Sequence, residues 1–235
     1  MSNHFFQFKQ FRIEQEFCAM KVSTDACIQG AWTPIFPEVK NVLDVGTGTG
    51  LLGLMLAQRN EQLLIDAIEI DEGAFLQAAR NFEASLWEKR LQIFQGDARS
   101  FELQRKYDLI ICNPPFFINS ILGTKQSRNY ARHQLSLNFD ELFLIIERNL
   151  IDNGYASVML PINEYQLWKE LLFSKKWCVF KELKIVPAKN KIENRIVSLC
   201  CRISKNIVEE ETLYIRDENN QYSIEYSKLL SPFYL

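Results

Sequence analysis

The sequence predicts an α/β fold in which a mostly parallel sheet carries helices on both faces. Short apolar segments alternate with amphipathic ones along most of the chain. Near-continuous apolar strands separated by helices are typical of a parallel sheet that is buried on both faces. The last two strand-like segments are separated only by PAKNKIEN, residues 187–194, so they should pair antiparallel. We therefore predict a mostly parallel seven-stranded sheet with an antiparallel last strand.

The elements follow from the period of the apolar residues. Strands are predicted at residues 42–46, 63–69, 91–96, 107–112, 155–160, 177–186 and 196–203. Helices are predicted at residues 51–59, 72–86, 139–150 and 163–175. In the tail, Asn219 and Asn220 lie between TLYIRDE and QYSIEY, which predicts a hairpin. We expect one domain over residues 1–235, with a C-terminal hairpin tail at residues 206–235.

Composition narrows the class of protein. The chain has 235 residues, of which 47% are hydrophobic and 24% charged, which is enough for one well-buried domain. The N-terminus has no apolar leader and no stretch reaches the length of a membrane span, so we expect a cytoplasmic protein. The cysteines have no CxxC spacing and only two histidines accompany them, which predicts reduced, buried thiols rather than a metal site. They are Cys18, Cys27, Cys112, Cys178, Cys200 and Cys201.

Charge is unevenly distributed, although the formal net charge is only −2. Residues 175–195 hold seven cations and two acids, a local charge of about +5. Residues 206–225 hold six acids and one arginine, a local charge of about −5. Residues 119–133 hold Lys125, Arg128 and Arg132 and no acid. Each stretch alone is typical of a solvated face. Because the net charge gives no overall attraction for nucleic acid, such a partner would have to be bound by a local cationic patch.

A glycine turn, in the stretch LDVGTGTG, follows the first predicted strand. Gly46, Gly48 and Gly50 alternate there, so backbone amides can turn tightly beneath a ligand without interference from Cβ atoms. A dinucleotide-binding turn has its third glycine one residue later, where this chain has Leu51. Asp44, just before the turn, would repel a pyrophosphate but would suit an ammonium group. The turn is thus predicted to bind a ligand with an amino group.

Carboxylates close the next two predicted strands, at the edge where ligands bind to parallel sheets. Glu69 can accept hydrogen bonds from both hydroxyls of a ribose, and Asp97, within GDA, from the exocyclic amine of adenine. Each acid alone would be an ordinary turn or capping residue. The ordered set, with partners for an ammonium, a ribose and an adenine, predicts S-adenosyl-L-methionine. The predicted cofactor-binding residues here are Asp44, Gly46, Thr47, Gly48, Gly50, Glu69, Ile70, Asp97, Ala98 and Asn113.

The fourth predicted strand runs into NPPF, which consists of Asn113, Pro114, Pro115 and Phe116. Two prolines remove two backbone donors and end the strand in a rigid turn. An amine conjugated to a ring is a poor nucleophile because its lone pair is delocalised. If the Asn113 side-chain oxygen and the Pro114 carbonyl each accept one N–H bond, the lone pair turns toward the methyl donor. Phe116 offers a face on which a planar base can stack. These four residues are the predicted catalytic group.

Together, DVGTGTG, AIEID, GDA and NPPF resemble a class I, Rossmann-like methyltransferase of the group that methylates amines. The stretch FKQFRIEQEFCAMKVSTDACIQGAW, with ARH at residues 131–133 and the ending SPFYL, narrows this resemblance. It is similar to bacterial tRNA-Val adenine N6-methyltransferases, which act on the purine beside the anticodon, position 37. The resemblance spans nearly the whole chain and implies N6-adenine methylation of tRNA-Val by S-adenosyl-L-methionine.

The resemblance also implies roles outside the sheet. Lys21, Thr24 and Asp25 would lie over the methionine end of the cofactor, within an N-terminal covering segment at residues 1–40. Where members commonly read GTDG and LLGAW, this chain has Ser23, Ala26 and IQGAW. The expected RNA contacts are in the loop after NPPF, with the cationic residues 175–195 as a second candidate. No membrane or obligate protein partner is implied; the loop residues are Lys125, Arg128, Arg132 and His133.

Other functions share this chemistry. A protein-glutamine N5-methyltransferase uses a similar NPP motif, but that family has a large helical domain before its glycine loop, and here about forty residues precede Gly46. DNA adenine methyltransferases with this motif order usually need a separate recognition domain. A ribosomal RNA methyltransferase would have the same chemistry. A cofactor-binding RNA chaperone without turnover is the alternative from another class, and the intact NPPF argues against it.

Overall fold

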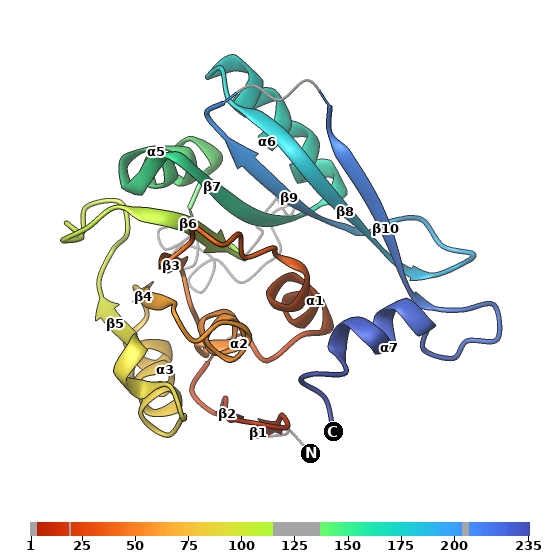
Figure 1. Cartoon of the computed structure of the whole chain (residues 1–235), viewed down its shortest axis with the longest axis horizontal. Coiled ribbons are helices and arrows are strands. Elements are labelled where there is room, and N and C mark those ends of the chain that lie inside the picture. Colours follow the sequence, from red (N-terminus) through yellow and green to blue (C-terminus); the bar gives the residue numbers. More distant parts are fainter. Residues whose placement is uncertain (1–3, 19, 115–136, 204–206) are drawn as a thin grey trace, which may run out of the picture.

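The computed structural model describes residues 4–18, 20–114, 137–203 and 207–235. An eight-stranded sheet, in the order β10-β8-β9-β7-β6-β3-β4-β5, forms its centre, and β1 and β2 form a separate two-stranded sheet (Figure 1). β9 is antiparallel to both β7 and β8, and the other pairings of the large sheet are parallel. The strands are β1 (Phe5–Gln7), β2 (Arg12–Glu14), β3 (Asn41–Val45), β4 (Leu64–Glu69), β5 (Leu91–Gln95), β6 (Tyr107–Cys112), β7 (Leu150–Pro161), β8 (Cys178–Ala188), β9 (Arg195–Cys201) and β10 (Glu209–Arg216).

Helices cover the two faces of the large sheet, with α5 and α6 on one side and α1 and α2 on the other (Figure 1). Local capping sets where several begin. Asp71 accepts from the Ala74 amide at the start of α3, and Asn138 and Glu141 form a reciprocal capping box at the start of α5. The helices are α1 (Thr24–Trp32), α2 (Leu51–Arg59), α3 (Glu72–Glu83), η1 (Glu88–Arg90), α5 (Phe139–Asn149), α6 (Ile162–Ser174) and α7 (Ile224–Leu230).

β6 shows why the apolar strands are continuous. Leu109 and Ile111 point into the core beneath α1 and α2, whereas Ile110 and Cys112 point into the core beneath α5 and α6. All four side chains are buried because alternate residues of a strand face opposite sides of the sheet. The predicted doubly covered parallel sheet is confirmed, as is the antiparallel pairing of β8 with β9.

The C-terminal tail differs from the prediction. TLYIRDE forms most of β10, which adds an eighth strand parallel to β8. QYSIEY leads into α7, because Ser223 accepts a hydrogen bond from the Tyr226 amide and starts a helix there. Tyr226 and Leu230 are buried, and α7 packs against α1. A short hairpin does form around Asn219 and Asn220, because Arg216 and Tyr222 make an antiparallel bridge and the Ser223 amide donates to the Ile215 carbonyl at 3.0 Å. It does not extend through residues 206–235, since the helix cap and burial of a helical face end the returning strand after Tyr222.

The two ends of the described chain meet (Figure 1). The Lys9 amide donates to the Phe233 carbonyl at 2.8 Å, and the rings of Phe6 and Tyr234 lie 5.8 Å apart. None of the six cysteines forms a disulfide, and all but Cys178 are buried, which agrees with the prediction for the other five. Within the described residues, none of the helices has the length and apolar character needed to cross a membrane.

Candidate active site

Four strand ends meet at one edge of the sheet. Val45 of β3 pairs with Ile68 of β4 and with Cys112 of β6, while Glu69 of β4 pairs with Gln95 of β5. The segments that follow these strands therefore lie next to one another at the carboxyl edge. Glu69 ends β4, and the segments after the other three strands contain the glycine turn, Asp97 and Asn113. The structure therefore brings the predicted residues of the central sheet together.

The glycine turn is open toward this edge and closed below it. Gly46, Gly48 and Gly50 have left-handed backbones, with φ of 68°, 58° and 81°. The Gly46 amide donates to the Ile68 carbonyl at 2.9 Å, which ties the turn to β4. A Cβ atom on Gly46 or Gly48 would meet no heavy atom within 4 Å, whereas one on Gly50 would lie 2.5 Å from Cε1 of Phe82. The turn is thus a cradle with open space above its amides.

Asp44 lies beneath the turn and is fully buried. Its Oδ2 accepts hydrogen bonds from the Thr47 hydroxyl at 2.6 Å and the Gly53 amide at 3.3 Å, and its Oδ1 has no partner. Burial, with a smaller effect of the neighbouring Glu69, raises the pKa of this carboxyl to about 7, although the hydrogen bonds from Thr47 and Gly53 lower it. In this structure Asp44 holds the turn. Contact with an ammonium group of a ligand stays a prediction.

Glu69 is held by backbone donors. Its Oε2 accepts from the Gly48 amide at 2.9 Å, and its Oε1 accepts from the amides of Ile70 and Asp71 at 2.9 and 3.0 Å. An ionised carboxylate has about four acceptor sites, so these three bonds orient it and leave capacity for a ligand hydroxyl. No cation among the described residues pairs with it. Glu69 therefore presents an uncompensated negative charge beside the glycine turn.

Asp97 has a partner that the sequence analysis missed. The Arg99 guanidinium donates from Nε to both carboxylate oxygens at 2.9 Å and pairs through NH2 at 2.6 Å. Its NH1 reaches Glu141 of α5 at 3.3 Å. The hydrogen bond with Arg99 holds the pKa of Asp97 below its usual value. An adenine amine would share Asp97 with Arg99, and Ala98 follows in the same turn.

The N-terminal segment is fastened to the glycine turn by Asn81 of α3, which the sequence analysis also missed. Asn81 Nδ2 donates to the carbonyls of Glu14 and Thr49, each at 2.9 Å, and its Oδ1 accepts from the Glu14 amide at 2.9 Å. Among the residues expected over the cofactor, Lys21 and Thr24 are exposed, and Asp25 lies 3.6 Å from Arg195. Their role at the methionine end of a cofactor stays a prediction.

At the end of β6, Asn113 is half-buried and Pro114 is buried. No described residue forms a hydrogen bond with the Asn113 side chain, so its amide remains available to a ligand. Pro115, Phe116 and the expected RNA-contacting residues lie outside the described part of the chain. These are Lys125, Arg128, Arg132 and His133.

Comparison with known proteins decides the family. A protein of Dyadobacter fermentans named tRNA1(Val) (adenine(37)-N6)-methyltransferase is 38% identical over 99% of this chain and 98% of its own length. A protein of Tolumonas auensis with the same name is 39% identical over 100% of this chain and 98% of its own length. The chain belongs to this methyltransferase family. The family model for the methyltransferase small domain matches residues 32–148.

Among solved structures, a predicted O-methyltransferase from Agrobacterium tumefaciens matches 88% of this methyltransferase and 96% of its own chain, with a TM-score of 0.70 and 13% identity. This likeness shows the fold. The family and the class I methyltransferase fold expected from the motifs are thus confirmed, and the open turn with the uncompensated Glu69 fits the adenosyl group of the expected cofactor.

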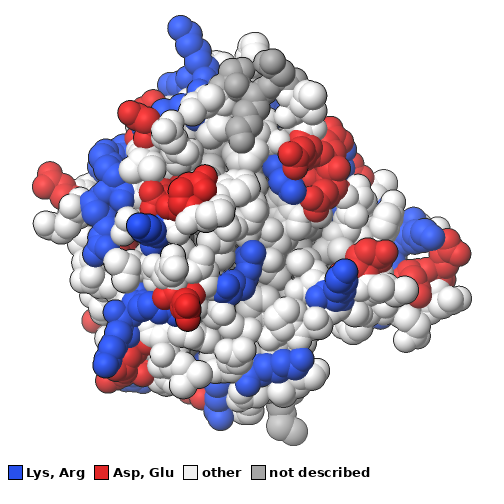
Figure 2. Space-filling model, viewed as in Figure 1, with Lys and Arg blue, Asp and Glu red and all other residues white. Residues whose placement is uncertain are grey.

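The second cationic stretch of this methyltransferase is largely neutralised. β10 lies beside β8 in parallel register, so its acids meet the lysines of β8. On the face shown in Figure 2, cationic and acidic side chains are interspersed. The lysines of β8 are therefore weaker candidates for phosphate contacts than the local charge of residues 175–195 indicates. The ion pairs are Lys181 with Glu209 and Glu211, Lys184 with Glu210, and Lys189 with Glu218.

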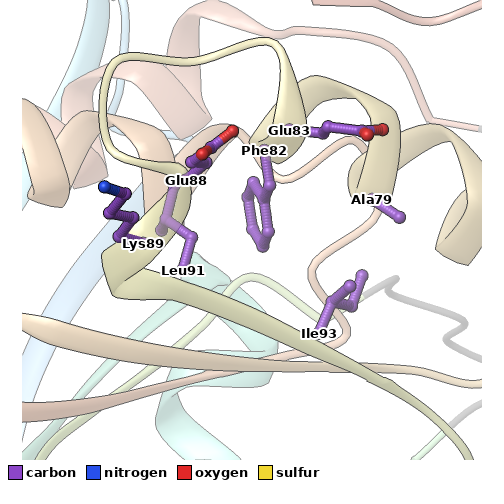
Figure 3. Close-up of a pocket in the computed structure, with 7 residues that line it drawn as sticks. All are labelled: Ala79, Phe82, Glu83, Glu88, Lys89, Leu91 and Ile93. Atoms are coloured by element: carbon purple, nitrogen blue, oxygen red, sulfur yellow. The ribbon is translucent and has the colours of Figure 1, made fainter.

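A shallow pocket of about 310 Å³ lies elsewhere, between α3, η1 and β5 (Figure 3). Phe82, Leu91 and Ile93 form its apolar part, and charged side chains including Glu88 and Lys89 surround them. Leu91 and Ile93 belong to the first half of β5, away from the carboxyl edge. The pocket contains none of the predicted site residues.

Proposed function

We propose that this protein transfers a methyl group from S-adenosyl-L-methionine to the exocyclic N6 of adenine-37 in tRNA1(Val). The observation that carries the proposal is the meeting of Glu69, the open glycine turn and Asn113 at one edge of the sheet. In this arrangement Glu69 would accept from the ribose hydroxyls and Asn113, at the neighbouring strand end, from the amine. The names of full-length relatives point to the same reaction and supply the RNA substrate.

The residues around the turn would hold the cofactor, which supplies an electrophilic methyl group on a sulfonium sulfur. Glu69 is oriented by three backbone amides to accept hydrogen bonds from the ribose. Asp97 would accept from the adenine amine of the cofactor, while Arg99 keeps it ionised. Fixed acceptors in a partly buried site lose little orientational freedom when the ligand binds.

On the acceptor side, the Asn113 side-chain oxygen and the Pro114 carbonyl accept the two N–H groups of the target adenine. These bonds orient the nitrogen lone pair toward the methyl group, and the proton released from the methylated amine passes to solvent. Pro114 is buried, and the proline that follows it in the sequence restricts its ψ to the extended range, which would hold the carbonyl before the substrate arrives. Phe116 would stack on the extruded base.

The proposal extends to the whole chain. Residues 1–235 act as one domain, with the segment at residues 1–40 covering the cofactor, supported by the hydrogen bonds of Asn81 to Glu14 and Thr49. The anticodon arm of the tRNA is bound by Lys125, Arg128, Arg132 and His133, and the reaction takes place in the cytoplasm. Anticodon loops suit this reaction because their unpaired bases cost less to extrude than bases in a duplex.

The test is methyl transfer from radiolabelled S-adenosyl-L-methionine to an unmodified tRNA1(Val) transcript, followed by nucleoside analysis. Ribosomal RNA, duplex DNA and a glutamine-containing peptide serve as competing substrates. We expect N6-methyladenosine at position 37 only, with rates that fall as salt rises. Equal or faster methylation of a competitor would assign the protein to that substrate, and cofactor binding without transfer would favour the chaperone alternative.

A further inference from the structure

Two cysteines face each other across the pair formed by β8 and β9. Cys178 is the first residue of β8 and Cys201 is the last residue of β9, and the antiparallel register places them opposite each other. Both side chains lie on the face of the sheet that α1 and α2 cover. Their Sγ atoms are 3.7 Å apart, although the two residues are 23 positions apart in the chain.

The backbone at this pair permits a disulfide. Directly opposed residues of an antiparallel pair have Cα atoms about 4.5–5.5 Å apart, within the range of about 4.4–6.8 Å that disulfides occupy. The sulfur atoms would have to approach to about 2 Å. An irregularity already shifts the ladder between Val179 and Lys181, and β8 begins and β9 ends at this pair. Few ladder hydrogen bonds therefore resist the movement.

Both thiols donate to one backbone oxygen. The Cys178 thiol donates to the Ile203 carbonyl at 2.9 Å, and the Cys201 thiol donates to the same carbonyl at 3.2 Å. With their hydrogens directed toward this oxygen, the two sulfur atoms can approach each other without a hydrogen between them. Ile203 lies at the surface, so water can hydrogen-bond to its carbonyl once the thiols are oxidised.

Cys200 is next to Cys201 in the chain but lies on the opposite face of the sheet. It belongs to the core beneath α5 and α6, where its thiol donates to the Ala156 carbonyl at 3.7 Å. All six cysteines are in the described part of the chain, and Cys178 is the one that is not buried. The thiolate is the reactive form, and burial raises the pKa of the thiols of Cys18, Cys27, Cys112 and Cys200.

We infer that Cys178 and Cys201 form a reversible oxidation site, in which Cys178 reacts with hydrogen peroxide and Cys201 converts the product into a disulfide. The Cys178 thiolate attacks one peroxide oxygen, so an S–O bond forms, the O–O bond breaks and water is released. The Cys201 sulfur then attacks the sulfur of this sulfenic acid. The S–S bond forms, the S–O bond breaks, and hydroxide leaves as water with the Cys201 proton. Two thiols are thereby oxidised, and one peroxide is reduced to two waters.

The disulfide protects Cys178 from irreversible oxidation. A sulfenic acid without a neighbouring thiol is oxidised further to sulfinic and sulfonic acids, which dithiols do not reduce, whereas a dithiol returns a disulfide to two thiols by exchange. This chemistry is separate from the proposed methyl transfer. Cys178 and Cys201 lie at the edge of the sheet where β8 begins, whereas Asn113 follows the carboxyl end of β6.

Peptide mapping of the full-length protein tests the inference. Reduced protein is treated with a slight excess of hydrogen peroxide, unfolded, blocked with N-ethylmaleimide and digested, and the peptides are analysed by mass spectrometry without reductant. We expect one disulfide, between the peptides of Cys178 and Cys201, which dithiothreitol reverses. Absence of this disulfide, or sulfinic acid at Cys178 in its place, would overturn the inference, and neither observation needs a variant.

Three variants assign the two roles. In Cys201→Ser, Cys178 should oxidise to sulfinic and sulfonic acids that dithiothreitol does not reverse, and in Cys178→Ser the disulfide should be lost with Cys201 still reduced. Cys200→Ser is the matched control, because it removes the adjacent cysteine on the opposite face, and it should form the same disulfide as the unmodified protein. Cys201→Ala and Cys200→Ala replace the serine variants if these do not fold. Reversible oxidation of Cys178 in Cys201→Ser, or loss of the disulfide in folded Cys200→Ser, would contradict the assignment.

Discussion

The two ends of the large sheet treat acidic side chains differently. At the ends of β3 and β4, Asp44 and Glu69 have no cationic partner among the described residues and are held by a hydroxyl and backbone amides. Along β8 and β10, by contrast, acids and lysines pair across neighbouring strands. Asp97, which Arg99 binds, lies between these cases. An acid whose charge is not compensated can still interact strongly with a ligand, whereas a paired one has already been neutralised.

The number of charged residues in a stretch of sequence does not reveal this difference, because it does not show which charges are paired. Residues 175–195 and 206–225 have the largest local charges in the sequence, yet much of that charge is satisfied internally. The carboxyl edge of β3 and β4 contributes two acids whose energetic consequences are larger because they are buried. Four predictions test the difference, beginning with the largest expected effect.

Asp44→Asn should change the pH dependence of stability most. In the unfolded chain the pKa of an aspartic acid is about 4, and in the folded protein burial raises that of Asp44 to about 7. The protonated Asp44 therefore stabilises the folded state fully below about pH 4, and this stabilisation is lost as the pH rises through about 7. That difference corresponds to about 4 kcal/mol. Urea unfolding of both proteins between pH 4 and 8, without ligand, measures it. A constant difference between them would mean that Asp44 is ionised at no cost.

Asn113→Ala should lower kcat by about 100- to 1000-fold, or about 2.7–4 kcal/mol, because a fixed group that acts on the reacting amine is removed. The affinity for S-adenosyl-L-methionine should stay within about threefold. Asn149→Ala is the control, since Asn149 is a buried asparagine at the end of α5 that donates to the Ile145 carbonyl. Steady-state kinetics at saturating RNA provide the comparison. Substantial activity in Asn113→Ala would mean that NPPF has only a structural role.

Glu69→Ala should weaken binding of S-adenosyl-L-methionine by about 1.5–3 kcal/mol, since charge-assisted hydrogen bonds to the ribose are lost. Calorimetry on the folded variant gives the value. Glu182→Gln is the control from the other region, because Glu182 is buried but already paired with Lys169 at 2.9 Å. Unchanged affinity in Glu69→Ala, or an equal loss in Glu182→Gln, would remove the distinction between compensated and uncompensated acids.

Lys184→Ala should have the smallest effect. Its ion pair with Glu210 is partly exposed, so the free energy of unfolding should fall by less than about 1 kcal/mol. RNA affinity should be unchanged. Arg128→Ala or Arg132→Ala should instead reduce the slope of log affinity against log salt by about one. Filter binding of tRNA across a salt series compares the variants, and an equal change of slope in Lys184→Ala would show that the β8 lysines contact phosphates.

The parts of the site that were predictable depend on short stretches of chain. The ends of β4 and β6 and the start of α2 were placed within one residue, because apolar periodicity and glycine or proline punctuation are local properties. The positive φ of Gly46, Gly48 and Gly50 likewise follows from their spacing in a strand-to-helix turn. In the tail, the turn at Asn219 and Asn220 was predictable from local sequence, but the returning strand is only a bridge at Tyr222, because a capping serine and a buried helical face favour α7 from Ile224 onward.

Local sequence patterns were sufficient to predict the fold class and to place Glu69 and Asn113 at the same edge of the sheet, while the chemical roles of these two residues stay predictions. Only the tertiary structure decided which side chains support or neutralise them. Gln29 meets Cys112 from 83 residues away, Arg99 meets Glu141 from 42, and Lys184 meets Glu210 from 26. Periodicity and turn chemistry act between neighbours in the chain, whereas hydrogen bonds and ion pairs form between whichever groups packing brings within about 3 Å. That is why the described acids at the ends of β3 and β4 have no cationic partner, whereas those of β10 are paired with lysines of β8.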